Sequence, residues 1–150
     1  FENDIAAGTI SRDDLFSDQY KPIANSKPQK FSSRFDAYTD RVLPALQEAF
    51  LAKNPDASYA IAIDRRGYVP THNRKFSQQL TGDEKIDFIN NRTKRLFDDP
   101  VGKRCGDHKQ PFLLQTYRRD TGEIMHDISA PVMVKGRQWG GFRIGYKTEV

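Results

Sequence analysis

The chain has 150 residues, of which 37% are hydrophobic and 29% charged, with a formal net charge of +4 and a single cysteine. A chain of this length can bury a core of its own, and one cysteine excludes an intramolecular disulfide, so we expect an ordinary globular unit. Basic and acidic residues are interspersed, which argues against nucleic acid as a partner.

The first residues and the hydropathy bear on where the protein is found. Phe1-Glu2-Asn3-Asp4 has neither the basic nor the apolar part of a signal peptide, and no initiator Met. No apolar run approaches the ~20 residues of a membrane span. We therefore expect a fragment of a longer protein, with any membrane anchor outside this chain. The lone Cys105 favours a cytoplasmic location over the alternative, a periplasmic one.

Residues 1–30 are predicted to be a connector, and residues 31–150 the domain itself. The first segment has the least core-like composition, with a short helix that Ser11 caps and a loop that contains Pro22 and Pro28. It would join the domain to an upstream part of the protein.

Residues 31–54 carry the clearest helix pattern. Apolar and aromatic residues recur at intervals of three or four and would share one face; they are Phe35, Tyr38, Val42, Leu46 and Phe50. Ser32 or Ser33 is a candidate N-cap. Pro44 lies inside the pattern and predicts a kink or a division into two helices.

Residues 58–64 and 68–71 are predicted to form a β-hairpin around the turn Arg66-Gly67. The following 73–110 segment is polar, and we expect it to be irregular with short helices. One helix would start at Thr81-Gly82-Asp83, and another would span residues 90–97.

Three more strands are predicted at 112–118, 123–134 and 139–146, joined by short turns into an antiparallel meander. Pro131 indicates an edge position or a bulge. The fold class is therefore α+β: a five-stranded antiparallel sheet with a long N-terminal helix, and short helices that cover one face. A ligand pocket would lie between that face and the short helices.

Metal and haem chemistry have little support in the residue pattern. Cys105 and His108 are separated as two ligands could be, but a zinc site needs about four, so they are only partial metal candidates. Covalent c-type haem needs two cysteines and is excluded. Non-covalent haem on His72, His108 or His126 stays open, and no cofactor is predicted.

Polar binding groups give the stronger signal. Arginine can grip a carboxylate or phosphate with two hydrogen bonds, so Arg92 or Arg95 would hold an anionic ligand. His126 is interpreted as a core residue, and the glycines beside Arg143 as allowing close packing. No set of residues converges as a catalytic centre, so an enzyme is not expected. The candidate ligand-binding residues are Tyr68, His72, Asn73, Arg92, Arg95, Tyr117 and Asp127.

Four long blocks resemble one known family. They are GYVPTHN at 67–73, NRTKRLF at 91–97, FLLQTYRRDTGE at 112–123 and WGGFRIGY at 139–146, with DRVLP at 40–44 ahead of them. In this order and spacing they resemble the PAS/Cache-like sensor domain of bacterial methyl-accepting chemotaxis proteins. The resemblance covers most of residues 15–147.

The resemblance implies a sensor fold attached to a coiled-coil module that controls a histidine kinase. Some relatives carry covalent c-type haem, and the solitary Cys105 departs from that subgroup. It also implies a homodimer, with the chemotaxis kinase and its adaptor reached through the rest of the receptor. The ligand is not implied by the motifs.

Two functions follow from these observations. The first is a small-molecule sensor, in which a ligand orders residues 73–110 and biases the helix at 31–54. The second is a dimerisation or protein-interaction module without a ligand, in which Phe1, Ile5 and Ile10 pack on a partner.

Overall fold

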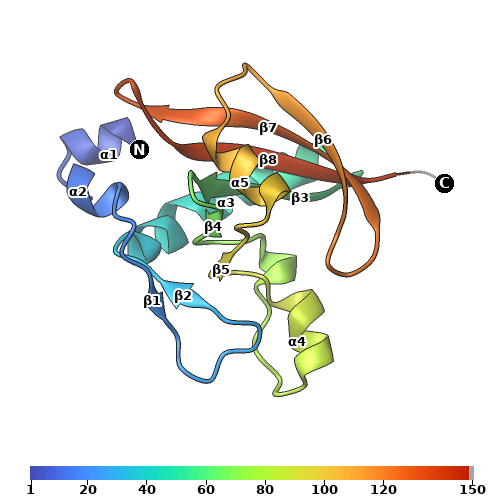
Figure 1. Cartoon of the computed structure of the whole chain (residues 1–150). Coiled ribbons are helices and arrows are strands. Elements are labelled where there is room, and N and C mark those ends of the chain that lie inside the picture. The colour runs from blue at the N-terminus through green and yellow to red at the C-terminus, as the bar shows by residue number, and fades with distance from the viewer. Residues whose placement is uncertain (149–150) are drawn as a thin grey trace.

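A computed structural model describes residues 1–148, and its architecture is α+β (Figure 1). The main sheet is antiparallel and has the strand order β3-β8-β7-β6. Its strands are β3 (Ala57–Asp64), β6 (Leu113–Arg118), β7 (Ile124–Val134) and β8 (Arg137–Lys147). The helices are α1 (Glu2–Ala6), α2 (Arg12–Leu15), α3 (Asp36–Lys53), α4 (Glu84–Asn90) and α5 (Pro100–Asp107), with a 3-10 turn η1 (Arg74–Phe76). Short strands form two further pairs, β1 (Lys21–Pro22) with β2 (Phe31–Ser32) and β4 (Tyr68–Val69) with β5 (Arg95–Leu96).

The predicted meander is confirmed, and its register decides which side chains meet. Gln115 lies opposite Asp127, Asp127 opposite Gly145, and Gly145 opposite Tyr59, so one row crosses all four strands. Side chains alternate between faces along a strand. The face that carries this row is covered by α5. Helix α3 packs on the opposite face, where Ala62 of β3 is buried in one cluster with Tyr38 and Leu43 of α3.

The main sheet has four strands where the sequence predicted five. The predicted strand at 68–71 is reduced to β4, which pairs with β5. Two side-chain amides cover the free edge of β3 instead. Asn73 binds both backbone groups of Ala60, at 2.9 and 3.0 Å, and Gln47 accepts the Ala62 N–H at 2.9 Å. Because these amides replace a neighbouring backbone, a fifth strand is not needed there.

Helix α3 starts later than predicted and presents a different face. It runs without a break through Pro44, so the predicted division into two helices does not occur. Pro44 has no N–H to donate to the carbonyl of Asp40, and Asp40 is exposed to water. The predicted caps are also wrong, because Phe35 is the N-cap residue and Ser33 instead binds the Asp36 side chain.

The buried face of α3 follows the prediction only in its first half. Tyr38 is buried as expected, but Leu46 is 58% exposed and Phe50 is 37% exposed. Leu43 and Gln47 are buried in their place. The helix turns its polar Gln47 inward because the edge of β3 supplies hydrogen-bonding partners.

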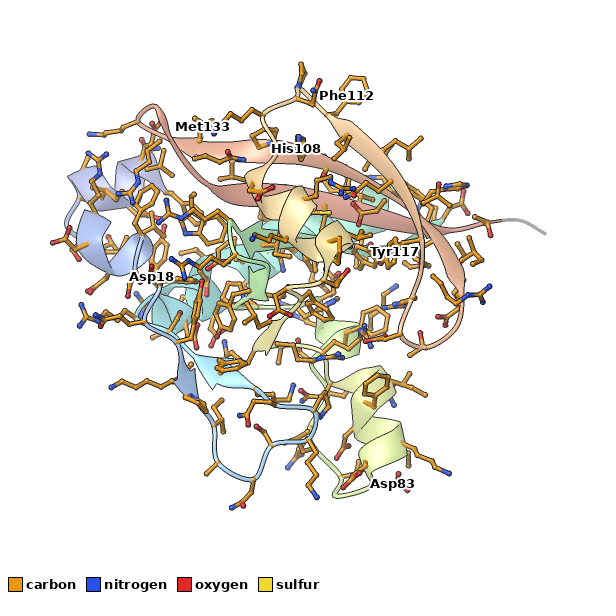
Figure 2. All side chains as sticks on the ribbon, viewed as in Figure 1. Asp18, Asp83, His108, Phe112, Tyr117 and Met133 are labelled. Carbon is orange, nitrogen blue, oxygen red and sulfur yellow. The ribbon has the colours of Figure 1, made fainter. Side chains whose placement is uncertain are left out.

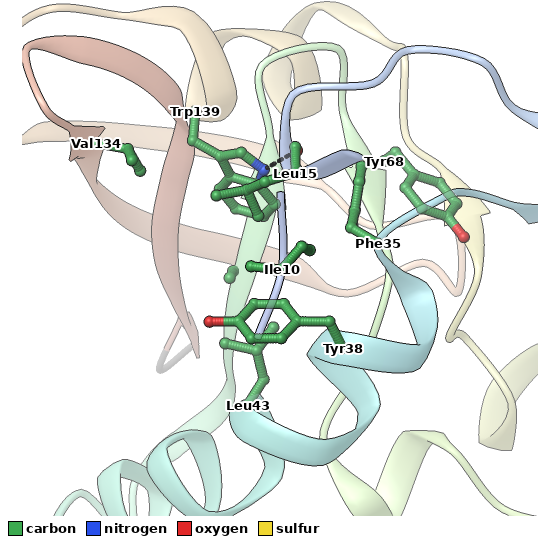
Figure 3. Close-up of a cluster of buried hydrophobic side chains, with 9 residues drawn as sticks. Ile10, Leu15, Phe35, Tyr38, Leu43, Tyr68, Val134 and Trp139 are labelled. Atoms are coloured by element: carbon green, nitrogen blue, oxygen red, sulfur yellow. Dashed lines mark hydrogen bonds between the residues drawn. The ribbon is translucent and has the colours of Figure 1, made fainter. Parts of the chain in front are cut away.

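The N-terminal segment is part of the core, where the sequence predicted a connector. Ile10 and Leu15 are buried in one cluster with Trp139, whose indole N–H donates to the Leu15 carbonyl at 2.9 Å (Figure 3). The ring of Phe1 packs against Trp139 with centroids 5.0 Å apart. The predicted cap is confirmed, since the Ser11 hydroxyl accepts the N–H of residue 14.

The middle segment matches the sequence predictions in part. Asp83 caps α4, close to the predicted start. The predicted helix at 90–97 is wrong: Lys94 has a φ of 64°, which a helix does not allow, and the chain forms β5 instead. Helix α5 was missed because its glycines suggested a loop. They are needed because α5 lies against backbone: a Cβ on Gly106 would lie 2.1 Å from the Asp64 carbonyl oxygen.

Pro131 occupies the edge position that the sequence indicated. Strand β6 pairs with β7 only as far as Ser129, so Pro131 has a partner on one side alone, Gly141 of β8.

None of the helices in residues 1–148 has the length and hydropathy to cross a bilayer.

Candidate ligand-binding site

A cavity of about 370 Å³ lies between the sheet and the segment that contains β5, a size in the lower range of small-molecule sites. Three parts of the chain that are distant in sequence enclose it: the sheet face, the residues around β5, and the turn between β6 and β7. Its lining is rich in arginine and aromatic residues: Arg92, Arg95, Arg118, Arg119, Arg143, Tyr59, Phe97, Tyr117, Ile61, Leu96 and His72, with Asp98, Asp99 and Asp120.

A buried hydrogen-bond network forms the floor of the cavity on the sheet. One Asp127 oxygen accepts from Arg143 Nε at 2.7 Å and from the Tyr59 hydroxyl, and the other accepts from Cys105 Sγ at 3.1 Å. Since the one hydroxyl proton of Tyr59 is used in this way, Tyr117 is the donor in the 2.9 Å contact between the two phenols. Arg143 Nη2 donates to both phenol oxygens, at 3.2 and 3.4 Å.

The network holds a charged pair inside the protein. Asp127 and Arg143 are 0% and 5% exposed. Burial alone would lower the pKa of Arg143, but Tyr59 and Asp127 outweigh it and raise that pKa well above its usual value. The guanidinium therefore stays charged, and its Nε–H is bonded to Asp127.

The opposite wall is joined to the turn between β6 and β7 by a shared carboxylate. Asp120 accepts from Arg92 Nη2 at 2.8 Å and from Arg95 Nη2 at 2.9 Å. Both guanidinium groups also lie over the ring of Phe97, at 5.5 and 4.6 Å from its centroid. Burial raises the pKa of Asp120, but the two arginines outweigh it and hold the pKa below its usual value. Asp120 is therefore an anion that closes this side of the cavity.

His72 presents a neutral donor to the cavity. Burial, followed by the nearby arginines Arg92 and Arg119, lowers its pKa well below the usual value. Its Nδ1 accepts the backbone N–H of Asn73 at 2.8 Å, so the single ring proton is on Nε2. The ring lies edge-on to Tyr59 and Phe76.

The structure brings four of the predicted ligand-binding residues together on the cavity: His72, Arg92, Arg95 and Tyr117. Asp127 lies beneath the floor and is bound by its neighbours. Two others lie elsewhere. Tyr68 is buried in the cluster that contains Leu15 and Trp139, with its hydroxyl 2.9 Å from Asp36. Asn73 covers the edge of β3.

Sequence reasoning missed Tyr59, Arg119 and Asp120. Arg119 and Asp120 fall in a predicted turn, and turn residues usually face solvent. Only the folding of this turn over the residues near β5 brings them inward. The packing interpretation of the glycines beside Arg143 is confirmed, because a Cβ on Gly141 would lie 2.1 Å from the Cys105 carbonyl oxygen of α5.

The partial metal candidates are occupied separately. His108 Nε2 lies 3.0 Å from the Ser129 hydroxyl, and Cys105 Sγ contacts Asp127 and Gln115. Within residues 1–148 there is no group of three His, Cys, Asp or Glu side chains placed to hold a metal ion. His126 is exposed and pairs with Thr116, where the sequence suggested a core position.

Comparisons with protein-family models, with curated proteins and with solved structures find no match for this chain. The function is therefore argued from the cavity and from the sequence blocks.

Cys105 is expected to resist alkylation in the folded protein. Burial raises the pKa of its thiol to about 12, so almost none is thiolate near neutral pH, and the side chain is 0% exposed. At about pH 8, iodoacetamide should label the native chain more than about 100-fold more slowly than the chain in denaturant. Similar rates in the two states would contradict this placement beneath the cavity floor.

Proposed function

We propose that the chain is the signal-sensing domain of a methyl-accepting chemotaxis receptor, with a PAS/Cache-like fold, that binds a small molecule in the cavity. The observation that carries the proposal is the cavity itself, enclosed by three segments distant in sequence. All four sequence blocks that resemble this family contribute to its lining: His72 lies in the first, Arg92 and Arg95 in the second, the Tyr117–Asp120 stretch in the third, and Arg143 in the fourth.

A route from the cavity to α3 supports a signalling role. His72 lines the cavity, and the residues on either side of it bind α3. Thr71 donates to Asp40 at 2.6 Å, and Asn73 donates to Glu48 at 3.0 Å. A ligand that shifts the segment around His72 would therefore act on α3 directly. The signal would pass through the rest of the receptor to the kinase and its adaptor.

Binding fits the site better than catalysis. Burial raises the pKa of the Cys105 thiol, which does not line the cavity, and the neutral His72 uses its Nδ1 to accept the backbone N–H of Asn73. We therefore propose a non-enzymatic domain on the cytoplasmic side, without a resident cofactor.

A dimerisation module is the second candidate, on a different surface from the one that the sequence suggested. Phe1, Ile5 and Ile10 pack within their own chain, so they are not free for a partner. Leu114 and Ile128 instead lie opposite each other on β6 and β7 and are 58% and 40% exposed. Phe112 projects away from the body nearby (Figure 2).

A thermal-melt screen of metabolites tests the proposed function. A ligand at about 100 times its dissociation constant adds about 2.7 kcal/mol, which shifts the melting temperature of a domain this size by several degrees. We expect a dose-dependent shift for one chemical class. Absence of any shift, together with a melting temperature that rises with protein concentration, would replace the sensor with the dimerisation module.

A further inference from the structure

Arg119 is a largely buried cation whose side chain makes no hydrogen bond or ion pair within residues 1–148. It follows β6 directly, is 8% exposed, and lines the cavity. Its guanidinium lies 5.7 Å from the centre of the Tyr59 ring and 5.0 Å from that of Phe76. Unlike Arg95 Nη1, its nitrogens are not fully buried, so they are open to solvent or to a ligand in the cavity. Stacking on rings does not supply hydrogen-bond acceptors to the five N–H groups of the guanidinium.

The other polar groups left over at the cavity are also donors. Arg95 Nη1 is buried and makes no hydrogen bond in the described part of the chain. His72 Nε2 carries the ring proton and has no acceptor there either. Without a ligand, Arg95 Nη1 has no partner in the described residues, which is costly for a buried donor, and the other N–H groups have water alone. Acceptor oxygens would satisfy all of them.

The charges on the buried wall do not balance. Arg143 is neutralised by Asp127, but Arg92 and Arg95 share the single carboxylate of Asp120. Those two arginines leave one positive charge, and Arg119 adds a second. Arg119 forms no ion pair within residues 1–148, although its charge also acts on Glu123, so Arg119 is a further candidate for the anion that the sequence had placed on Arg92 or Arg95.

We propose that the ligand of the cavity is a small organic anion whose carboxylate- or phosphate-type oxygens bind Arg119, with Arg95 and His72 as further donors. This deepens the proposed function and rests on it. The apolar part of the ligand would lie against Tyr59, Ile61 and Phe97, which line the same space.

The mouth of the cavity narrows the class of anion. Asp98 and Asp99 line it and are exposed. Asp99 is held by the N–H groups of Val101 and Gly102 as the N-cap of α5, but both carboxylates disfavour a ligand with several negative charges, and a space of about 370 Å³ suits a compact molecule. A compact ligand with one anionic group fits both constraints.

Stability gives a test that needs no ligand. Arg119→Met keeps the apolar stem of the side chain but removes the guanidinium, with its charge and its stacking on Tyr59 and Phe76. We expect this variant to melt no lower than the wild type, since a largely buried cation without an ion pair does not stabilise the fold. Arg41→Met, which removes an exposed charge on α3, on the other side of the sheet, should melt as the wild type does. A lower melting temperature for Arg119→Met would make Arg119 a structural residue and overturn the proposal.

Calorimetric titration then tests the anion directly. The probes are benzoate and phenylacetate, their neutral amides benzamide and phenylacetamide, and inorganic phosphate. We expect each acid to bind at least about tenfold more tightly than its amide, with Arg119→Met removing the preference and Arg41→Met leaving it intact. Binding of phosphate alone in the same Arg119-dependent way would identify a phosphate-type group on the ligand.

The outcomes separate this inference from the proposed function. Equal binding of acids and amides, or acid binding that Arg119→Met leaves unchanged, overturns the anion while the cavity remains a ligand site. Failure of every acid, amide and phosphate probe also overturns it. The proposed function itself fails if no compound of any charge shifts the melt in the metabolite screen.

Discussion

Replacement of Asp127 by alanine is expected to lower the free energy of unfolding by about 3–5 kcal/mol, because it leaves a buried guanidinium without its counter-charge. Asp127 is 0% exposed and accepts from Arg143, Tyr59 and Cys105. Without the carboxylate, all three donors at the cavity floor lose their hydrogen-bond acceptor. Urea denaturation of the variant and the wild type, with equal slopes, measures the loss.

A double-mutant cycle separates the ion pair from the space that the side chains fill. Asp127→Ala combined with Arg143→Leu should lose less stability than the sum of the two single variants, since neither charge is then buried alone. A loss below about 1 kcal/mol for Asp127→Ala would mean that water reaches Arg143, and would contradict the closed floor.

Replacement of Asn73 by alanine is expected to cost about 2–5 kcal/mol, because both backbone groups of Ala60 lose their partner inside the protein. The side chain of Asn73 is bonded to the N–H and the carbonyl of that residue. It is also bonded to Glu48 on α3. The amide of Asn73 therefore takes the place of a neighbouring strand at this point of β3.

Asn54→Ala is the matched control for Asn73→Ala. The Asn54 amide donates one exposed hydrogen bond, to the Phe50 carbonyl, so its loss should cost less than about 1 kcal/mol. Equal losses for the two variants in urea denaturation would show that the edge of β3 is satisfied by other groups.

The strands of the meander could be predicted because their evidence is local. Alternation over residues 112–146, interrupted by two turns, needs no knowledge of the rest of the chain. The missing fifth strand could not be predicted in this way. The amides that cover β3 come from Asn73 and Gln47, which lie 13 and 15 residues from their partners on either side of it. A polar side chain gives no signal that it will serve as a substitute for backbone.

The candidate site could be predicted in its residue types but not in its charge balance. Arg92, Arg95, His72 and Tyr117 were identified, and all four line the cavity. Which arginine is left without a carboxylate partner depends on the position of Asp120. That position depends on how the turn between β6 and β7 folds over the residues near β5. The same turn buries Arg119.

Mapping where a ligand binds is the most direct test of the sensor cavity. The measurement is a two-dimensional amide NMR titration of the 150-residue chain with the compound that most raises the melting temperature. We predict that the largest shifts fall on residues 72, 92–97 and 117–120, with Asp40 and Glu48 on α3 following at the same ligand concentrations. Shifts gathered instead around Leu114 and Ile128, with the cavity residues unmoved, would contradict a ligand-sensing cavity.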